Sequence, residues 1–411
     1  MKTRRVGNEN LHRARRTSTV AAACALTLLA AQAAAPALAG TTEQAERIYE
    51  RLAGVQPSSG VLQQMVTALG GPSPTPVPAG DARLVAAAAI ATDPGTAPTF
   101  YNVTLKNWAM PWTNRNQSVF MPLNDYVATV IGMVRDNVPF DQVLYGDILY
   151  TVSGSGLPAV SPANNNHYAT AEANGVNLAA TLTTNTQSGA YGTPVAATAG
   201  VLTTAAGAGA YFVAGTNRAQ FRFTMINHMC NDMQTLMDTS QPTDRIRQDV
   251  SRSPGGDSRI FLNNCVGCHS GMDPMAQAFA YYNFDATQNV LLYTPGQTQA
   301  KYHINTTNFP QGFVTPDDSW SNRWRTGPNS VFGWSSSLPG SGNGAKSWGQ
   351  EIAGSKQFAA CKVQQVYQAV CFRSPTTLAD INKAKDLTNS FQSGYNLRSL
   401  FQQVAANCAG N

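Results

Sequence analysis

Two cysteines and a histidine form the most informative pattern in the sequence. They lie in the run Cys265-Val266-Gly267-Cys268-His269, which has CxxCH spacing. Two thiols three positions apart at the start of a helix can form thioethers with the two vinyl groups of haem, and the next residue then places an imidazole under the iron. Gly267 lets the short loop approach the porphyrin edge. The pattern predicts one covalently bound haem c, with His269 as an iron ligand.

Two other chemistries use a pair of cysteines at this spacing. A redox dithiol is expected inside a thioredoxin-like βαβ pattern, which the sequence around residues 265–269 lacks. Half of a zinc site would need a second Cys or His pair at ligand spacing, and none is present in the sequence. No Ser-His-Asp triad, phosphate loop or nucleotide fingerprint is recognisable elsewhere. Haem attachment is therefore favoured.

The N-terminus has the features of an export signal. A basic region at 13–16 precedes an apolar stretch at 20–35, and Ala37-Leu38-Ala39 offers small residues before Gly40. This predicts a signal peptide at 1–39, cleaved near Ala39, because a membrane anchor needs roughly 18 or more apolar residues. No other segment is apolar enough to span a bilayer. We expect a periplasmic or secreted protein with no transmembrane segment in the mature chain, which agrees with haem attachment outside the cytoplasm.

The composition is that of a globular protein. Of 411 residues, 43 % are apolar and 12 % are charged, which excludes disorder driven by high net charge. Six of the 28 basic residues but only one of the 23 acidic residues lie in 1–39, so the remainder carries 22 of each and is neutral. Nucleic-acid binding needs clustered Lys and Arg, which a neutral chain lacks. We therefore expect no nucleic-acid partner.

The hydrophobic pattern predicts a mainly α fold, with helical modules and long irregular loops around one covalently bound c-type haem. One helix is expected to begin at a capping box, Thr41-x-x-Gln44, a second to cover 61–69 and end before two glycines, and a third to begin after Asp81, which would cap it. Further helices are expected over 126–134, 221–237, 355–371, 378–391 and 397–408. A stiff linker is expected at 72–78. Residues 151–210 and 285–350 have no sustained period and are predicted to be loops, with His167 on the surface.

These elements group into five predicted regions. They are a signal peptide at 1–39, an N-terminal helical module at 40–150, a loop-rich and helical segment at 151–250, a haem module with a Trp-rich insertion at 251–350, and a C-terminal helical module at 351–411.

The sixth coordination position of the iron, opposite His269, is either filled by another residue or left open. Met272 and Met275 would rise only about 4.5 and 9 Å along the same side of the helix, so neither reaches that face. No methionine follows Met275 in the sequence. The usual downstream methionine ligand is therefore not available.

An upstream helix supplies the predicted sixth ligand. We choose His228, because helical angles place it with Met229 on one face while Cys230 points away. Met229, the downstream His303 and an open iron site are the alternatives. Core packing is the competing interpretation of the methionines on this helix.

Arg323 and Trp324 are predicted to bind the haem propionates. Guanidinium and indole N–H groups are suitable donors to carboxylates. The competing interpretation is that the arginine pairs with nearby Asp317 or Asp318 on the surface.

The sequence from 265 to 285, CVGCHSGMDPMAQAFAYYNFD, resembles the haem module of the planctomycete-type cytochrome c proteins. In that family CxxCH is followed by Asp-Pro, an Ala-Phe pair and a closing Phe-Asp, here Asp273-Pro274, Ala278-Phe279 and Phe284-Asp285. Residues 200–223 and the C-terminal part are similar to the segment before the haem and to the family's C-terminal helical module. The long insertion at about 286–350 departs from the pattern. The resemblance implies a c-type cytochrome but little about its reaction.

Four cysteines remain after Cys24, which leaves with the signal, and the two haem thiols. Ten residues on one helix would separate Cys361 and Cys371 by about 15 Å, which is too far for a disulfide. The resemblance implies that Cys230 pairs with Cys361 and that Cys371 pairs with Cys408. An even number of cysteines in an oxidising compartment agrees with two disulfides.

Three functions are compatible with such a protein. The favoured one is one-electron transfer between extracytoplasmic redox partner proteins, for which no acid or base group is needed. The second is a haem enzyme of peroxidase or oxygenase type with an open distal iron site. The third is a haem-bearing subunit of an exported assembly.

Overall fold

The first helices form where apolar residues recur at helical spacing. A computed structural model describes residues 40–408 except 214, 305 and 308, so the predicted signal peptide lies outside the described residues. Helices α1 (Thr41–Ala53), α2 (Ser59–Ala68) and α3 (Ala82–Ile90) follow the predicted pattern, and Asp81 caps α3 by accepting the amide of Arg83. The prediction of a capping box at Thr41 is wrong. The N-cap is Gly40, and the Thr41 hydroxyl instead donates to the carbonyl of Gly71 at 2.9 Å.

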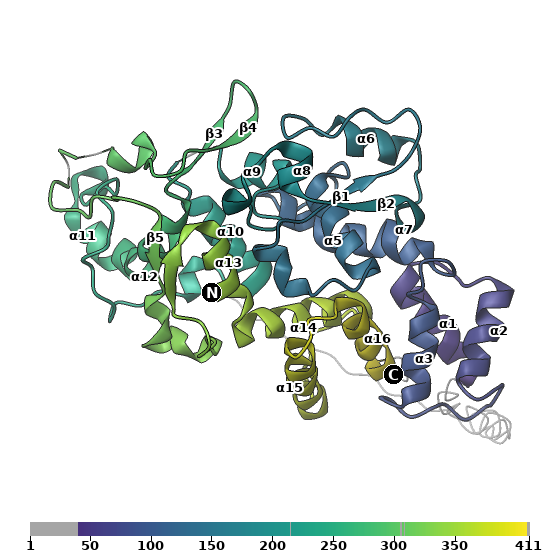
Figure 1. Ribbon diagram of the computed structural model, residues 1–411. Coiled ribbons are helices and arrows are strands. Elements are labelled where there is room, and N and C mark those ends of the chain that lie inside the picture. The colour runs from purple at the N-terminus through teal and green to yellow at the C-terminus, as the bar shows by residue number, and fades with distance from the viewer. Residues whose placement is uncertain (1–39, 214, 305, 308, 409–411) are drawn as a thin grey trace, which may run out of the picture. The chain divides into compact units, whose positions relative to one another are not determined.

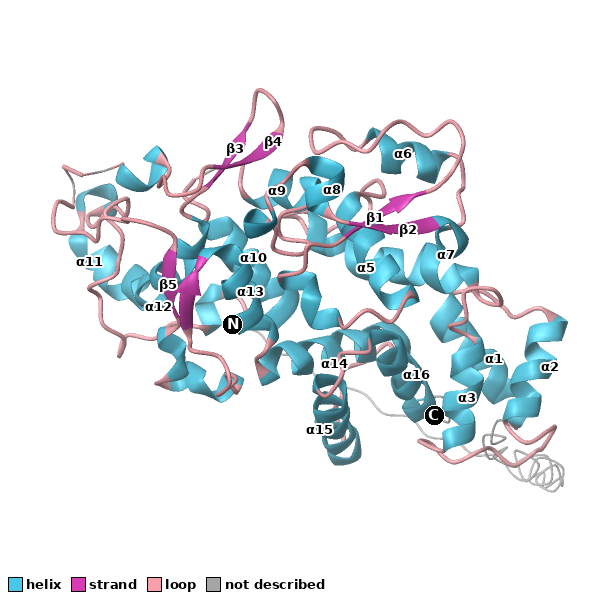
Figure 2. Ribbon diagram, in the orientation of Figure 1, coloured by secondary structure: helices cyan, strands magenta, loops and turns pink. Residues whose placement is uncertain are grey.

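Helices dominate the rest of the described chain, which confirms the mainly α prediction (Figures 1 and 2). They are α4 (Lys106–Ala109), α5 (Asp125–Arg135), α6 (Asn166–Ala173), α7 (Leu178–Thr181), α8 (Gln187–Tyr191), α9 (Ala205–Tyr211), α10 (Arg218–Met229), α11 (Ser258–Ile260), α12 (Val266–Ala276), α13 (Gly344–Ala353), α14 (Lys356–Cys371), α15 (Leu378–Gln392) and α16 (Leu397–Cys408).

Short strands form three separate antiparallel pairs, β1 with β2, β3 with β4, and β5 with β6 (Figure 2). Their bounds are β1 (Leu149–Val152), β2 (Leu182–Asn185), β3 (Tyr282–Asp285), β4 (Val290–Tyr293), β5 (Ser319–Ser321) and β6 (Ser341–Asn343).

The two regions predicted as loops contain regular structure. Residues 151–210 hold four short helices and the β1–β2 pair, and residues 285–350 hold α13 and most of the other strands. His167 is buried in α6, where its Nε2 accepts the amide of Val152 at 3.0 Å and its Nδ1 donates to the carbonyl of Pro158 at 2.8 Å. The surface prediction for His167 is therefore wrong.

Helix α10 is shorter than predicted. It ends at Met229 because Cys230 takes the left-handed conformation, with a φ of 53°. The chain then turns away, so that Met233 and Met237 lie outside the helix. The face that the prediction assigned to a helix over 221–237 therefore does not exist beyond Met229.

The C-terminal helices pack against one another and against helices from earlier parts of the chain. Helix α16 packs against α3 and α14, and α14 also contacts α10. The described residues all belong to one compact unit. Disulfides join Cys230 to Cys361 and Cys371 to Cys408, which confirms both predicted pairs. Among the described residues no helix is both long and apolar enough to cross a membrane.

Candidate functional site

One helical segment carries the CxxCH run. It begins with α11, which Asp257 caps by accepting the amide of Arg259, and passes through a π-helical turn at Phe261–Cys265. It continues as α12, whose first turn contains Cys268 and His269. The run therefore spans a change of helix type, and π-helical turns are frequent at functional sites.

The two thiols of the run are free and half-buried, whereas the four other cysteines of the described chain are paired. The Cys268 sulfur lies 3.4 Å from the carbonyl oxygen of Met233. Burial raises the pKa of the Cys268 thiol, and the nearby Cys265 and Asp232 raise it further. Cys268 is therefore a protonated thiol at neutral pH.

Apolar side chains beside the thiols are exposed. Ile260 and Leu262, on the same helical segment, are 42 % and 56 % exposed, and Met237 is 46 % exposed. Met237 adjoins the run, since its Cβ lies 3.4 Å from where a Cβ on Gly267 would stand. These side chains are available for contact with an apolar ligand.

His269 is oriented by a carboxylate one turn further along α12. Its Nδ1 lies 3.1 and 3.2 Å from the two oxygens of Asp273. A carboxylate only accepts hydrogen bonds, so Nδ1 carries the proton and Nε2 keeps its lone pair in the neutral ring. A ligating histidine almost always donates its other N–H in this way. The arrangement leaves the Nε2 lone pair free to bind a metal.

Asp273 is fully buried within a network of charges. Arg218, the first residue of α10, donates to both of its oxygens at 2.7 and 3.1 Å, and the amide of Arg247 donates at 3.2 Å. Arg218 also binds both oxygens of the buried Asp249 at 2.8 Å. Burial alone would raise the pKa of Asp273, but Arg218, His269 and Arg247 hold it well below its ordinary value. Asp273 is therefore a carboxylate anion at neutral pH.

No protein-family model, no curated protein and no solved structure matches the chain. The chemistry of the residues themselves must therefore indicate the ligand. Two free thiols one helical turn apart, followed by a histidine with Nε2 available, are the donor set of a c-type haem. Within the described part of the chain, no three His, Cys, Asp or Glu side chains gather closely enough to hold a metal ion. The residues present fit haem, whose porphyrin supplies most of the ligands to its iron.

The two predicted propionate ligands lie in different surroundings. Arg323 donates to both oxygens of Asp244, at 2.6 and 2.9 Å, so its guanidinium is already paired, although with neither of the two aspartates considered from the sequence. Trp324 is fully buried beside α12, and its indole N–H has no hydrogen-bond partner among the described residues. The indole nitrogen lies close to Gly271, in the space that a side chain there would occupy. Propionate binding by Arg323 and Trp324 stays a prediction.

Gly271 gives a direct test of this packing. A Cβ at Gly271 would lie 2.0 Å from Nε1 of Trp324, and the indole cannot easily retreat because it packs edge-on against Phe221. We expect Gly271→Ala to lower the free energy of unfolding by about 1–3 kcal/mol, as overpacking does. Gly209→Ala on α9 is the matched control, since no atom lies within 4 Å of the new Cβ. Equal stability of the two variants in urea unfolding would contradict the packing.

His228 lies in a different environment from His269. Its Nε2 lies 2.8 Å from the hydroxyl of Tyr126, and its ring packs between Trp112 and Phe358. Burial, and then the charge of Lys362, lower the pKa of His228 well below its ordinary value. The contacts of His228 and those of His269 are separate sets of residues.

The length of α10 explains why His228 lies away from His269. Arg218 contacts Asp273 at the start of this helix, and His228 follows ten residues later, about 15 Å along the axis. His228 and Cys230 both contact α14, so the prediction that they point to opposite sides is wrong. The structure does not bring His228 to His269, and iron ligation by His228 stays a prediction. Of the alternatives, Met229 accepts a hydrogen bond from the Ser355 hydroxyl through its sulfur. His303 is exposed at the end of a 3₁₀ helix, Ala300–His303.

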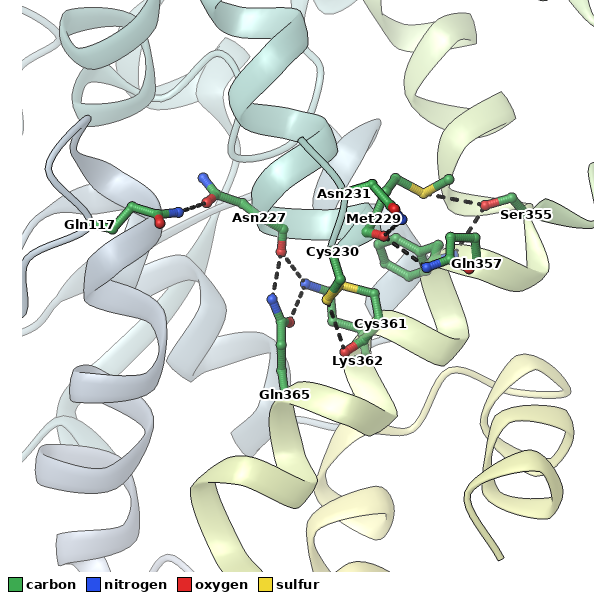
Figure 3. The surroundings of a disulfide bond; sticks show 11 residues. Gln117, Asn227, Met229, Cys230, Asn231, Ser355, Gln357, Cys361, Lys362 and Gln365 are labelled. Carbon is green, nitrogen blue, oxygen red and sulfur yellow. Dashed lines mark hydrogen bonds between the residues drawn. A yellow bond between two sulfur atoms is a disulfide. The ribbon is translucent and has the colours of Figure 1, made fainter. Parts of the chain in front are cut away.

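The end of α10 is fastened to α14 (Figure 3). Cys230 is bonded to Cys361, and the next residue, Lys362, donates to the carbonyl of Asn227 at 2.9 Å. The ammonium of Lys362 also lies 4.0 Å from the centre of the Trp112 ring. Burial lowers the pKa of Lys362 well below its ordinary value. One end of α10 is thus held by the C-terminal helices and the other by the buried charges around Asp273.

The residues that orient His269 were missed in the sequence interpretation. Asp273 had a local signal, because it follows His269 by four positions on a predicted helix and such residues face each other. Arg218 and Asp249 had none, since they lie 55 and 24 positions from Asp273 and meet it only through the fold.

Proposed function

We propose that this chain is an exported c-type cytochrome with one haem, which transfers single electrons between redox partner proteins outside the cytoplasm. The observation that carries the proposal is the hydrogen bond from His269 to the buried Asp273, beside two cysteines that are free while the four others in the described part of the chain are paired. This is the donor set of a haem held by two thioethers and one imidazole.

Each residue of the site has a distinct task. The S–H groups of Cys265 and Cys268 would add across the two vinyl groups, so that two C–S bonds form and no atom is lost. His269 would bind the iron through Nε2, and Asp273 would hold the ring in that tautomer. A bound haem supplies the one-electron couple of its iron. One electron is taken from a reduced partner protein and later given to an oxidised one.

A second candidate is a haem enzyme of peroxidase or oxygenase type, and one observation favours it. A carboxylate on Nδ1 makes the imidazole a more basic ligand, and a more basic ligand supports the higher oxidation states that such enzymes use. The hydrogen bond between His269 and Asp273 therefore suits both functions. They differ in whether the sixth position of the iron is filled.

The absorption spectrum of the purified protein separates the two candidates. We expect low-spin ferric and ferrous spectra that carbon monoxide does not change, because an electron carrier keeps both axial positions filled. A high-spin ferric spectrum with ready binding of carbon monoxide after reduction would contradict electron transfer and support the enzyme.

A further inference from the structure

The carboxylate of Asp273 binds both His269 and Arg218. Asp273 accepts a hydrogen bond from His269, and Arg218 donates two N–H groups to the same two oxygens. Asp273 is fully buried, so water does not weaken either interaction by competition or screening. The position of this charge is therefore well suited to affect the group that His269 would ligate.

The sign of that effect follows from elementary electrostatics. A carboxylate on Nδ1–H increases the electron donation of Nε2 to a bound metal, and donation stabilises the oxidised iron over the reduced iron. Arg218 acts in the opposite sense, because its charge draws electron density from the shared carboxylate. Its bonds to Asp273 are 2.7 and 3.1 Å long.

We propose that Asp273 is a positioning residue that acts through His269 to lower the reduction potential of the bound haem, and that Arg218 limits the size of this effect. This inference rests on the proposed function, because it requires a haem on His269. This role for Asp273 follows neither from the CxxCH spacing nor from the family resemblance, in which Asp273-Pro274 is only a matching pair.

Asp249 provides a matched control within the same network. Like Asp273 it is buried and binds Arg218 with both oxygens, at 2.8 Å. Arg247 donates to its two oxygens as well, at 3.3 and 3.4 Å. Asp249→Asn therefore removes the same charge from the same network without changing the His269 hydrogen bond.

The test is a spectroelectrochemical titration of the full-length haem protein and of both variants at one pH and ionic strength. We expect Asp273→Asn to favour reduction at least tenfold, which is about 59 mV for a one-electron couple. The shift in Asp249→Asn should be several times smaller. Equal shifts in the two variants, or no shift in Asp273→Asn, would overturn the inference and leave the proposed function intact. A wild-type protein without haem would overturn both.

A second measurement needs no variant to fold. Nitrogen NMR of labelled histidine in the reduced wild-type protein should show the His269 proton on Nδ1, hydrogen-bonded and slow to exchange with solvent. Rapid exchange at Nδ1 would show that Asp273 does not hold the ring and would overturn the inference alone. A proton on Nε2 would exclude iron ligation by His269 and would overturn the proposed function as well.

Discussion

Replacing Cys265 and Cys268 together by serine should abolish covalent haem binding. Both thiols are free and half-buried, three positions apart on one helical segment, and a serine hydroxyl does not form the thioether. After export in a host that matures c-type cytochromes, we expect the variant to lose all haem that resists extraction with acidified acetone. Haem staining of a denaturing gel, normalised to protein, measures this loss.

The control for this variant lies in the same turn. Asn263→Ser/Asn264→Ser makes two substitutions at exposed positions just before the thiols and should keep its haem. Covalent haem on the Cys265→Ser/Cys268→Ser variant would place the attachment site elsewhere and contradict the proposed site.

Of the two disulfides, the one between Cys230 and Cys361 should contribute more to the free energy of unfolding. The bond closes a loop with a sequence separation of 131 and fastens the end of α10 to α14. We expect Cys230→Ala/Cys361→Ala to lower the free energy of unfolding by about 2–5 kcal/mol. Such a loss is a large part of the roughly 5–15 kcal/mol that stabilises a typical domain.

The other disulfide is the matched comparison. The separation between Cys371 and Cys408 is only 37, and its loop does not overlap the first. Loop entropy then predicts that Cys371→Ala/Cys408→Ala loses about 1 kcal/mol less than the other pair. Urea unfolding under non-reducing conditions measures both losses. A greater loss from the shorter loop would show that strain or packing, and not chain entropy, governs these bonds.

Local signals in the sequence were sufficient for the long helices and for the attachment run. Helices such as α14 and α16 have apolar residues at helical spacing, and the caps of α3 and α14 are Asp81 and Ser355. The CxxCH run needs only adjacent positions to be recognised. Both disulfide pairs followed from the family resemblance and not from spacing alone.

Short elements rich in small or polar residues were missed. Helix α9 is AAGAGAY and α6 is NHYATAEA, and neither has a continuous apolar stripe. They form because tertiary contacts hold their ends: the buried Asp125, for example, accepts the amides of Ala205 and Ala206 at the start of α9. Such contacts join residues about 80 positions apart, which no local pattern records.

The sixth-ligand prediction shows a different limit. Helical angles apply only within a helix, and α10 ends at Met229, so they do not place Cys230. Both the His228 face and Cys230 meet α14, because Cys230 leaves the helix in a left-handed conformation. By contrast, the partner of His269 was within reach of the sequence, since Asp273 is four positions away on the same helix.

The most direct test of the central proposal is the mass of one peptide. Trypsin cleaves after Arg259 and Lys301 and leaves residues 260–301 intact, with both cysteines of the run. From protein that was exported, matured and stripped of free haem, our proposal predicts that this peptide carries the mass of one haem. The same peptide with two unmodified thiols, or with Cys265 bonded to Cys268, would contradict it.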